Sequence, residues 1–244
     1  MRCLLLDIET SPNTAFVWSL WKETIPLDRL IESSEVLCWS AKWLGSEEVM
    51  FDSIYKSKPI DMLRGIHKLM DEADAIIHYN GLRFDIPCLN KEFLIYGMTP
   101  PAPYKNIDLY KTVKGQFKFT SNKLKHVLER LGLENKIDTT FQLWVDCMNR
   151  VPEAWKYMEE YNKNDVVVLE KLYHILKPWV TNHPNRSLYT ERSEIMCPVC
   201  GSNHFHSRGS YYTTVGKYKR YQCLDCGKWF RGRDNMSYRQ VLSV

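Results

Sequence analysis

Short apolar segments and longer amphipathic segments alternate along the first 178 residues. The apolar segments have the length and composition of strands, and they predict strands at residues 2–8, 13–18, 35–44, 48–55, 74–79 and 107–110. Apolar residues at intervals of three and four predict helices at residues 59–73, 85–96, 121–132 and 152–177. Because strands come first and helices then alternate with strands, we expect an α/β fold with a mixed sheet.

Residues that break or cap regular structure support several of these boundaries. Asn80-Gly81 separates a predicted strand from the helix that follows it, and Pro152 suits the first turn of the longest helix. Ser121 is expected to cap the helix at 121–132, and Gly132 is expected to end it.

The last quarter of the chain has a different pattern. Residues 179–194 are polar and show no periodicity, so they predict a linker between a domain at 1–178 and a small module at 195–244. Within the module, the segment SYYTTVGKYKRYQ at 210–222 predicts a hairpin that turns near Val215-Gly216.

Composition indicates the cellular compartment. The chain has 244 residues, 44% hydrophobic and 25% charged, and no apolar run reaches the ~18 residues of a membrane span. The start lacks the long apolar region of a signal peptide. Cys3, Cys38, Cys88 and Cys147 are scattered and predicted to be free core thiols, which suits a reducing, cytoplasmic location.

Charge is distributed unevenly between the two predicted parts. Residues 179–244 contain 10 Lys and Arg but 4 Asp and Glu, whereas the first 178 residues contain 23 and 25. A basic module attached to a slightly acidic domain indicates a polyanionic partner, although small modules are also often basic for solubility.

Three acidic segments are candidates for a site. Asp7 and Glu9 are two residues apart in a predicted strand, so both side chains point to one face. Two adjacent carboxylates repel each other unless a cation lies between them, and hard ions such as Mg²⁺ or Mn²⁺ prefer oxygen ligands. Alone, such a pair is as well explained by a solvated strand end.

The second and third segments are also ambiguous when each is taken by itself. Asp85 opens an apolar helix in HYNGLRFDIPCL at 78–89, where it suits a helix cap. Tyr161 and Asp165 in YNKNDVVVLEKLY lie one turn apart on a predicted helix, facing either a site or solvent.

Taken together, the three segments resemble the motifs of the DEDD exonuclease superfamily, in the tyrosine-containing branch that includes the proofreading domains of family B DNA polymerases. The matching residues are DIET at 7–10, NGLRFD at 80–85 and YNKND at 161–165. The resemblance covers about residues 1–178. It implies a ribonuclease H-like mixed sheet flanked by helices, and removal of nucleotides from a 3′ end with two divalent ions.

The resemblance also implies roles for individual residues. Asp7, Glu9, Asp85 and Asp165 look like the ligands of two Mg²⁺ or Mn²⁺ ions, with Asp7 shared by both. Tyr161 would orient the attacking water, because a phenol with a pKa near ~10 is a poor base at neutral pH.

Further expectations concern substrate and partners. Asn80 and Phe84 match motif positions near the terminal nucleotide, although Phe84 also suits the core. The segment after DIET lacks the glycine common in some relatives, which puts the local substrate contacts in doubt. No polymerase region is recognised, so we expect a free-standing enzyme, or one acting beside a polymerase or other replication or repair protein.

DNA is the favoured substrate, but two alternatives stay open. One is an endonuclease or RNA-processing nuclease on the same fold. The other is a non-catalytic adaptor that binds nucleic acid.

The C-terminal module contains two CxxCG sequences. Cys197, Cys200, Cys223 and Cys226 have the spacing of a structural Zn²⁺ site, with 22 residues between the pairs. We therefore expect a zinc ribbon. Aromatic and cationic residues alternate beside the cysteines and could contact bases and phosphates, although they would also suit ribbon packing or protein docking: Tyr218, Lys219, Arg220 and Trp229.

Overall fold

The computed structural model describes residues 1–133, 137–191 and 194–237. Part of the predicted linker, residues 192–193, and the end of the predicted C-terminal module, residues 238–244, lie outside the described residues. No helix in the described part of the chain is both long enough and apolar enough to cross a bilayer.

A five-stranded sheet with the order β5-β4-β1-β6-β7 forms the centre of the larger part. Its strands are β1 (Cys3–Thr10), β4 (Val36–Trp43), β5 (Met50–Ser53), β6 (Ala75–His78) and β7 (Lys105–Asp108). β4 is antiparallel to β1 and β5, whereas β6 is parallel to β1 and β7. The predicted mixed sheet is thereby confirmed.

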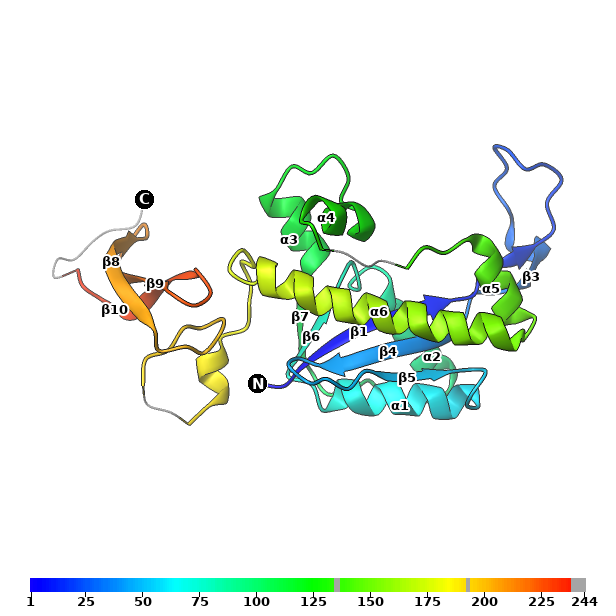
Figure 1. Ribbon diagram of the computed structural model, residues 1–244, viewed down its shortest axis with the longest axis horizontal. Helices are drawn as coiled ribbons and strands as arrows, with labels where there is room; N and C mark the ends of the chain where they lie inside the picture. The colour runs from blue at the N-terminus through cyan, green and yellow to red at the C-terminus, as the bar shows by residue number, and fades with distance from the viewer. Residues whose placement is uncertain (134–136, 192–193, 238–244) are drawn as a thin grey trace.

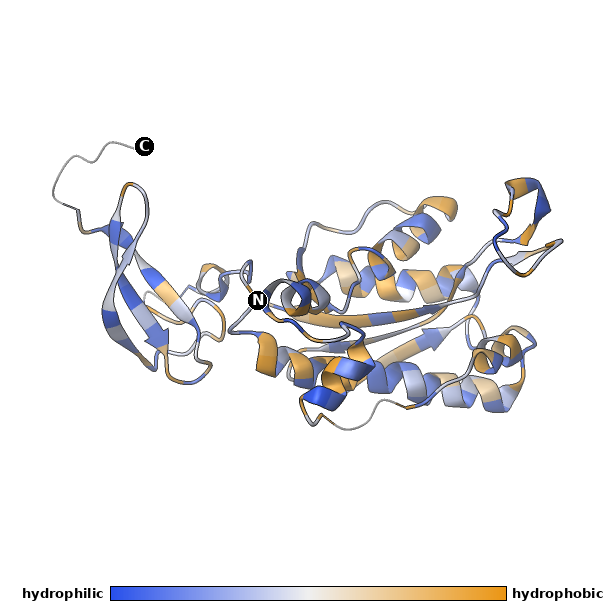
Figure 2. Ribbon diagram, turned by 90° about the horizontal axis from the view of Figure 1, so that it is seen from above, coloured by the Kyte–Doolittle hydropathy of each residue, from blue (hydrophilic) through white to orange (hydrophobic). Residues whose placement is uncertain are grey.

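Helices cover both faces of this sheet (Figure 1). One layer contains α1 (Pro59–Asp71) and α2 (Asp85–Ile95); the other contains α3 (Leu109–Gln116), α4 (Leu124–Arg130) and α6 (Pro152–Leu176), with α5 (Phe141–Met148) packed beside α6. The strands between the layers are mostly hydrophobic in Figure 2, as expected for a sheet buried on both faces.

The alternation of side chains along β1 fixes the position of the acidic residues. Leu4, Leu6 and Ile8 pack on the α1 and α2 side, whereas Cys3 and Leu5 pack on the α6 side. Because alternate residues share a face, Asp7 and Glu9 continue the face of Cys3 and Leu5 and lie toward α6.

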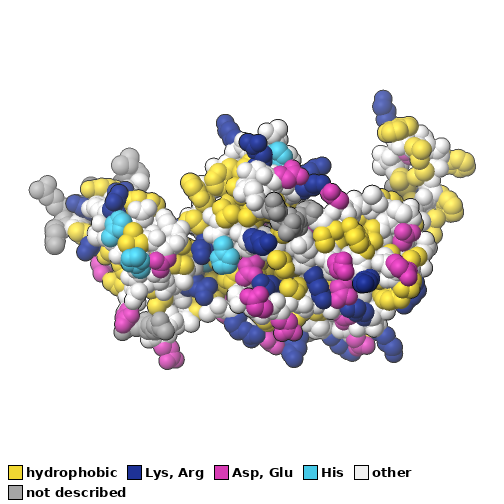
Figure 3. Space-filling view, viewed as in Figure 1, with side chains coloured by type: hydrophobic (Ala, Val, Ile, Leu, Met, Phe, Trp, Pro, Cys, Tyr) yellow, Lys and Arg dark blue, Asp and Glu magenta, His cyan; other side chains and the backbone are white. Residues whose placement is uncertain are grey.

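The strand expected at 13–18 is wrong in extent. Only Thr14–Ala15 is a strand (β2), and it pairs with β3 (Leu30–Glu32), which follows η1 (Leu27–Arg29). We call residues 13–32 the projecting hairpin. Its apolar side chains point into solvent, with Phe16 72% and Trp18 88% exposed, and they form the yellow projection at the right of Figure 3. A short apolar run predicts burial, but no element in the described part of the chain covers these side chains.

Other differences concern helices. The helix expected at 121–132 begins at Leu124, and its N-cap is Lys123, not Ser121. The Ser121 hydroxyl instead accepts a hydrogen bond from the Lys123 N–H in the turn before the helix, at 3.3 Å. Both α3 and α5 were absent from the sequence prediction, because each is only eight residues long.

The C-terminal module is a three-stranded antiparallel sheet with the order β10-β9-β8. Its strands are β8 (Phe205–Tyr212), β9 (Lys217–Cys223) and β10 (Trp229–Asn235), and the short helix η2 (Arg186–Tyr189) precedes them. The hairpin turn lies between β8 and β9 as expected, but β10 was not predicted. The core is small, consisting of Cys197, Val199 and Cys223 with Phe230 against them.

Residues of the predicted linker contact both parts of the protein. Val180 is buried in the core beneath α6, and its carbonyl oxygen accepts a hydrogen bond from Lys228 Nζ in the ribbon at 2.7 Å. His183 Nε2 lies 2.8 Å from the Tyr173 hydroxyl of α6. The segment therefore packs against its neighbours at these residues.

Candidate active site

Three carboxylates meet between β1 and α6. Asp7 and Glu9 come from β1 and Asp165 from α6, and one oxygen of each lies within 4.8 Å of the other two. Asp165 is only 5% exposed, so its charge is poorly solvated. Like charges at this spacing repel strongly unless a cation lies among them, and an all-oxygen donor set suits Mg²⁺ or Mn²⁺. The cluster therefore fits a hard divalent ion.

Asp85 lies next to this cluster, from the opposite helix layer. β6 pairs with β1 only through Cys3–Leu5, so the edge of β1 beyond Leu5 is open on that side. There the Ile8 N–H donates to Asp85 Oδ1 at 3.2 Å. Asp85 thus contacts the backbone between Asp7 and Glu9, although it is not one of the three carboxylates within 4.8 Å.

Burial changes the acidity of two of the predicted residues. Burial, with a smaller effect of the nearby Asp108 charge, raises the pKa of Asp85 to about 7, although two backbone hydrogen bonds act to lower it. Burial, followed by the charges of Asp165, Glu9 and Asp7, also raises the pKa of Tyr161. The phenol therefore keeps its proton at neutral pH.

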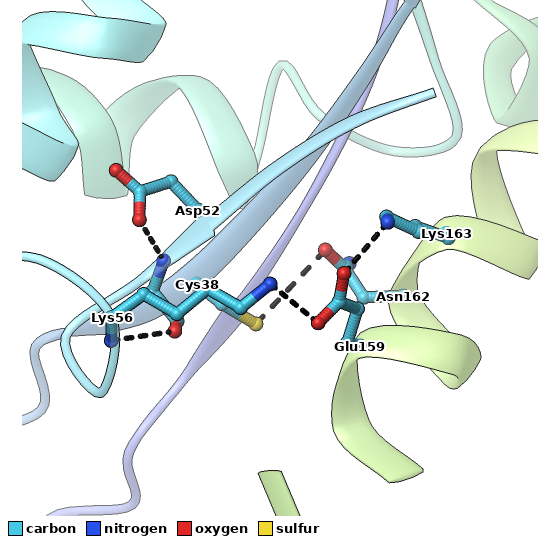
Figure 4. Close-up of polar contacts among 7 residues, drawn as sticks. Cys38, Asp52, Lys56, Glu159, Asn162 and Lys163 are labelled. Atoms are coloured by element: carbon cyan, nitrogen blue, oxygen red, sulfur yellow. Dashed lines mark hydrogen bonds and ion pairs between the residues drawn. The ribbon is translucent and has the colours of Figure 1, made fainter. Parts of the chain in front are cut away.

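The buried face of α6 carries a polar residue next to Asp7 that sequence reasoning missed. Asn162 is fully buried, and its Nδ2 donates to Asp7 Oδ2 at 2.7 Å. Figure 4 shows its side chain toward Cys38 of β4, with a 4.0 Å contact between Cys38 Sγ and Asn162 Oδ1. The available signal was helical spacing: Asn162 precedes Asp165 by three residues and so shares its face.

Glu159 of the same helix forms two ion pairs, one of them within α6 and the other with the segment after β5. Glu159 accepts from Lys56 Nζ and Lys163 Nζ, each at 2.6 Å, as drawn in Figure 4. On the other side of the cluster, the Trp144 ring of α5 packs edge-on against Tyr161, with centroids 6.1 Å apart. The Lys56 pair therefore joins α6 to the segment after β5, and the Trp144 ring joins it to α5.

Asp108 organises the turn that leads to Asp85. Its Oδ1 accepts from the Asn80 N–H at 3.0 Å and caps α3 by accepting from the Lys111 N–H at 3.3 Å. Asn80 has a φ of 68°, in the left-handed region that Asn tolerates. Asp108 is therefore a positioning residue for the NGLRFD segment.

A neutral histidine supports the same turn. His78 Nδ1 accepts from the Gly81 N–H at 3.0 Å, so Nε2 carries the proton and donates to Asn106 Oδ1 at 3.0 Å. Burial lowers the pKa of His78, which agrees with this neutral form. Gly81 leaves no room for a side chain, because a Cβ there would lie 2.6 Å from His78 Cγ.

The predicted substrate residues fall in two places. Asn80 and Phe84 lie in the turn before Asp85, and Phe84 is 44% exposed instead of buried in the core. The ribbon residues lie beyond the C-terminal end of α6, away from the carboxylates (Figure 1): Tyr218, Lys219, Arg220 and Trp229. They do not line the acidic cluster.

The four late cysteines form the second cluster suited to a metal. Their sulfur atoms lie within 4.8 Å of one another, with 3.7 Å between Cys197 and Cys226 and 3.5 Å between Cys200 and Cys223. A tetrahedral ion with Zn–S bonds of ~2.3 Å would place sulfurs about 3.8 Å apart. The arrangement fits Zn²⁺ and leaves no open coordination position.

A comparison with protein families agrees with this architecture. A family model described as RNase H superfamily matches residues 4–177. The chain belongs to the RNase H superfamily. Membership indicates nuclease activity at the level of the superfamily, and therefore a nucleic-acid substrate. The matched segment contains all three acidic motifs of this RNase H-like domain.

One solved structure that resembles the RNase H-like chain is the family B DNA polymerase from the hyperthermophilic archaeon Pyrobaculum calidifontis. The two share 17% sequence identity with a TM-score of 0.49, over 90% of this chain and 33% of the polymerase chain. The chain thus corresponds to about a third of that polymerase's length. A comparison with curated protein sequences found no match.

Proposed function

We propose that the protein is a metal-dependent 3′→5′ exonuclease that hydrolyses phosphodiester bonds, with DNA as the favoured substrate. The observation that carries the proposal is the meeting of Asp7, Glu9 and Asp165, with Asp85 bound to the backbone between the first two. This set is complete for the motif pattern described above. Superfamily membership supports a nuclease, and the motif pattern supports the 3′→5′ direction.

In this proposal Asp7, Glu9 and Asp165 would hold one divalent ion, and Asp85 together with Asp7 would hold a second. When bound, such ions lower the pKa of the attacking water and stabilise charge on the attacking and leaving oxygens. Asn162 holds Asp7 by donating from Nδ2 to Oδ2, and such a contact would orient this carboxylate as a metal ligand.

Tyr161 positions the nucleophile. Its hydroxyl stays protonated because burial and the three nearby carboxylates raise its pKa. A protonated phenol both donates and accepts hydrogen bonds, so it can orient a water without removing its proton. The side chain is itself fixed by the Trp144 ring.

The deciding experiment is a degradation assay on 3′- and 5′-labelled single-stranded DNA, duplex DNA and RNA, with Mg²⁺ and with Mn²⁺. We expect mononucleotides released from the 3′ end, and loss of activity in Asp7→Asn with the fold retained. The matched control is Asp52→Asn, a partly buried carboxylate on the edge strand β5 that is not in the cluster. Full activity of Asp7→Asn would contradict the proposal.

A circular single strand separates the remaining alternatives. Cleavage of the circle would identify an endonuclease, because an exonuclease needs an end. Absence of divalent-ion binding in a calorimetric titration, together with absence of cleavage, would identify a non-catalytic adaptor.

A further inference from the structure

Three arginines form a row across the ribbon sheet. Arg220 of β9 is paired with Arg231 of β10, and a bulge in β8 sets Arg208 and Gly209 opposite Arg220. Gly209 has a φ of 76°, in the left-handed region that a glycine adopts readily at a bulge. All three arginines are exposed. One arginine from each strand therefore lies on a common line.

The strand register shows which face carries the row. Tyr221 packs against Phe205 and Phe230 on the core side of the sheet, with centroids 5.4 and 5.5 Å away. Because neighbours along a strand point to opposite faces, Arg220 lies on the other side, which we call the outer face. Arg231 shares it as the partner of Arg220.

Aromatic residues accompany the row on the outer face. Trp229 is paired with Gln222, and Tyr218 is two residues from Arg220, so both lie on this side. Lys219 is next to Arg220 and falls on the core side. Three of the four ribbon residues expected to contact substrate thus share the outer face, whereas Lys219 does not.

Each guanidinium lies over a ring. Arg231 Cζ is 4.0 Å from the Tyr218 centroid, and Arg220 and Arg208 Cζ are 5.1 and 5.9 Å from the Trp229 centroid. Such stacking orients the planar cation and leaves its N–H donors available. The Arg220 side chain is also anchored, because Nε donates to the Arg208 carbonyl at 2.8 Å.

The row is costly for the isolated ribbon, because like charges opposite each other on neighbouring strands destabilise a sheet. Among the ribbon residues that the structure describes, the ion pair formed is between His204 and Asp225, at the second cysteine knuckle. No carboxylate of the described residues forms an ion pair with the three arginines. Their charge is therefore left for a ligand.

We propose that the outer face of the ribbon binds a single strand of nucleic acid. The choice of nucleic acid over an acidic peptide rests on the proposed function, which supplies the substrate class. The structure adds two matching features: planar guanidinium forks suit phosphate oxygens, and the exposed rings of Trp229 and Tyr211 suit stacking with unpaired bases. The face would hold the strand upstream of the 3′ end that is being cut.

The test measures binding by the full chain carrying Asp7→Asn, which prevents cleavage during titration. Labelled 30-nucleotide single strands of DNA and of RNA are titrated by fluorescence anisotropy at several salt concentrations. We expect Arg220→Ala to reduce the slope of log affinity against log salt by about 0.7. We expect Trp229→Ala to weaken binding roughly 5- to 150-fold.

The matched control is Lys217→Ala, which removes one positive charge from the core side of the same strand. Zinc content, measured for every variant, shows that the ribbon remains folded. We expect Arg220→Ala and Trp229→Ala to bind the oligonucleotide more weakly than the parent chain, and Lys217→Ala to bind it equally well. Arg220→Lys, which keeps the charge but loses the fork, is expected to fall between.

Equal losses in Arg220→Ala and Lys217→Ala would overturn the proposal, because only net charge would then matter. Polyglutamate that competes with the oligonucleotide at equal charge would also overturn it and would identify an acidic protein partner. The tighter of the DNA and RNA arms identifies the sugar. Because binding is measured without cleavage, failure of the nuclease proposal leaves this result unaffected, and the converse also holds.

Discussion

The Asn162 side chain donates a hydrogen bond from Nδ2 to Asp7 Oδ2 across 2.7 Å, joining α6 to β1 in the core of the acidic cluster. Both ends of this contact are constrained. Asn162 is fully buried beside Cys38, and Asp7 is fixed by the pairing of β1 with β4. The amide therefore selects one orientation of the Asp7 carboxylate.

Replacing Asn162 with Ala should reduce activity about 10- to 100-fold, because groups that orient metal ligands have effects of this size. The loss should appear mainly as weaker Mg²⁺ or Mn²⁺ affinity, measured by titrating the ion in the degradation assay. Lys163→Ala is the matched control on the same helix, since it removes a partly exposed ion pair with Glu159 and a contact with the Phe51 ring but nothing from the acidic cluster. An unchanged ion affinity in Asn162→Ala would count against the positioning role.

The raised pKa of Asp85 predicts a pH dependence of stability. Without Mg²⁺, burial raises the pKa to about 7, so between about pH 4 and pH 7 the folded protein holds a proton that the unfolded chain has released. Stability contributed by this group is then present at low pH and is lost as pH rises through 7.

The measurement is thermal unfolding in Mg²⁺-free, chelator-free buffer across this range, compared with Asp85→Asn. The asparagine variant should lack this part of the pH dependence. Added Mg²⁺ should stabilise the native protein more at high pH, where the carboxylate is ionised and can bind it. Identical pH profiles for the two proteins would refute the assignment.

Asp108 should prove to be structural. Asp108→Asn keeps an oxygen that can accept from the Asn80 and Lys111 N–H groups, so we expect a folded protein with most of its activity. Asp108→Ala loses both bonds and should lower the free energy of unfolding by about 1–3 kcal/mol. Denaturant unfolding and the degradation assay check this pair. If Asp108→Asn is as inactive as Asp7→Asn, Asp108 instead belongs to the catalytic machinery.

The ribbon should fold only with its metal, because its core of three buried residues is too small to stabilise it alone. We expect one zinc ion for each native chain, and loss of zinc and of the ribbon fold in Cys223→Ser. Cys88→Ser is the control, since Cys88 lies in α2 and is partly exposed. Elemental analysis and unfolding curves test this. Retention of zinc by Cys223→Ser would exclude the four-cysteine site.

Sequence patterns predicted the central sheet and the long helices, because a strand buried on both faces is a continuous apolar run, as at Leu4–Leu6, and a helix buried on one face repeats its apolar residues, as at Leu63 and Ile66. The projecting hairpin was misjudged for the same reason. Phe16 and Trp18 have the composition of a buried strand, yet they lie in solvent. A local sequence pattern shows which side chains are apolar. It does not show whether another part of the chain packs over them.

Spacing and resemblance were enough to name the residues of the acidic cluster. The residues that position them could not be named in this way. Asn162 lies 155 residues from Asp7, and Asp108 lies 28 residues from Asn80, so both contacts depend on tertiary structure. The row of three arginines across the ribbon could not be predicted, because the bulge in β8 adds one residue and changes the register of Arg208. The domain boundaries and the assignments of site residues remain predictions for the experiments above.

The straight course of α6 has a consequence for the length of the products. Asp165 and Leu176 are separated by eleven residues of one helix, or about 16 Å at its rise of ~1.5 Å per residue. That equals about five nucleotides of stacked strand at ~3.4 Å each. A strand held at both the acidic cluster and the ribbon must be longer than this. Oligonucleotides that become shorter than this during digestion should therefore dissociate from the ribbon. Short fragments should then accumulate as a ladder before digestion is complete.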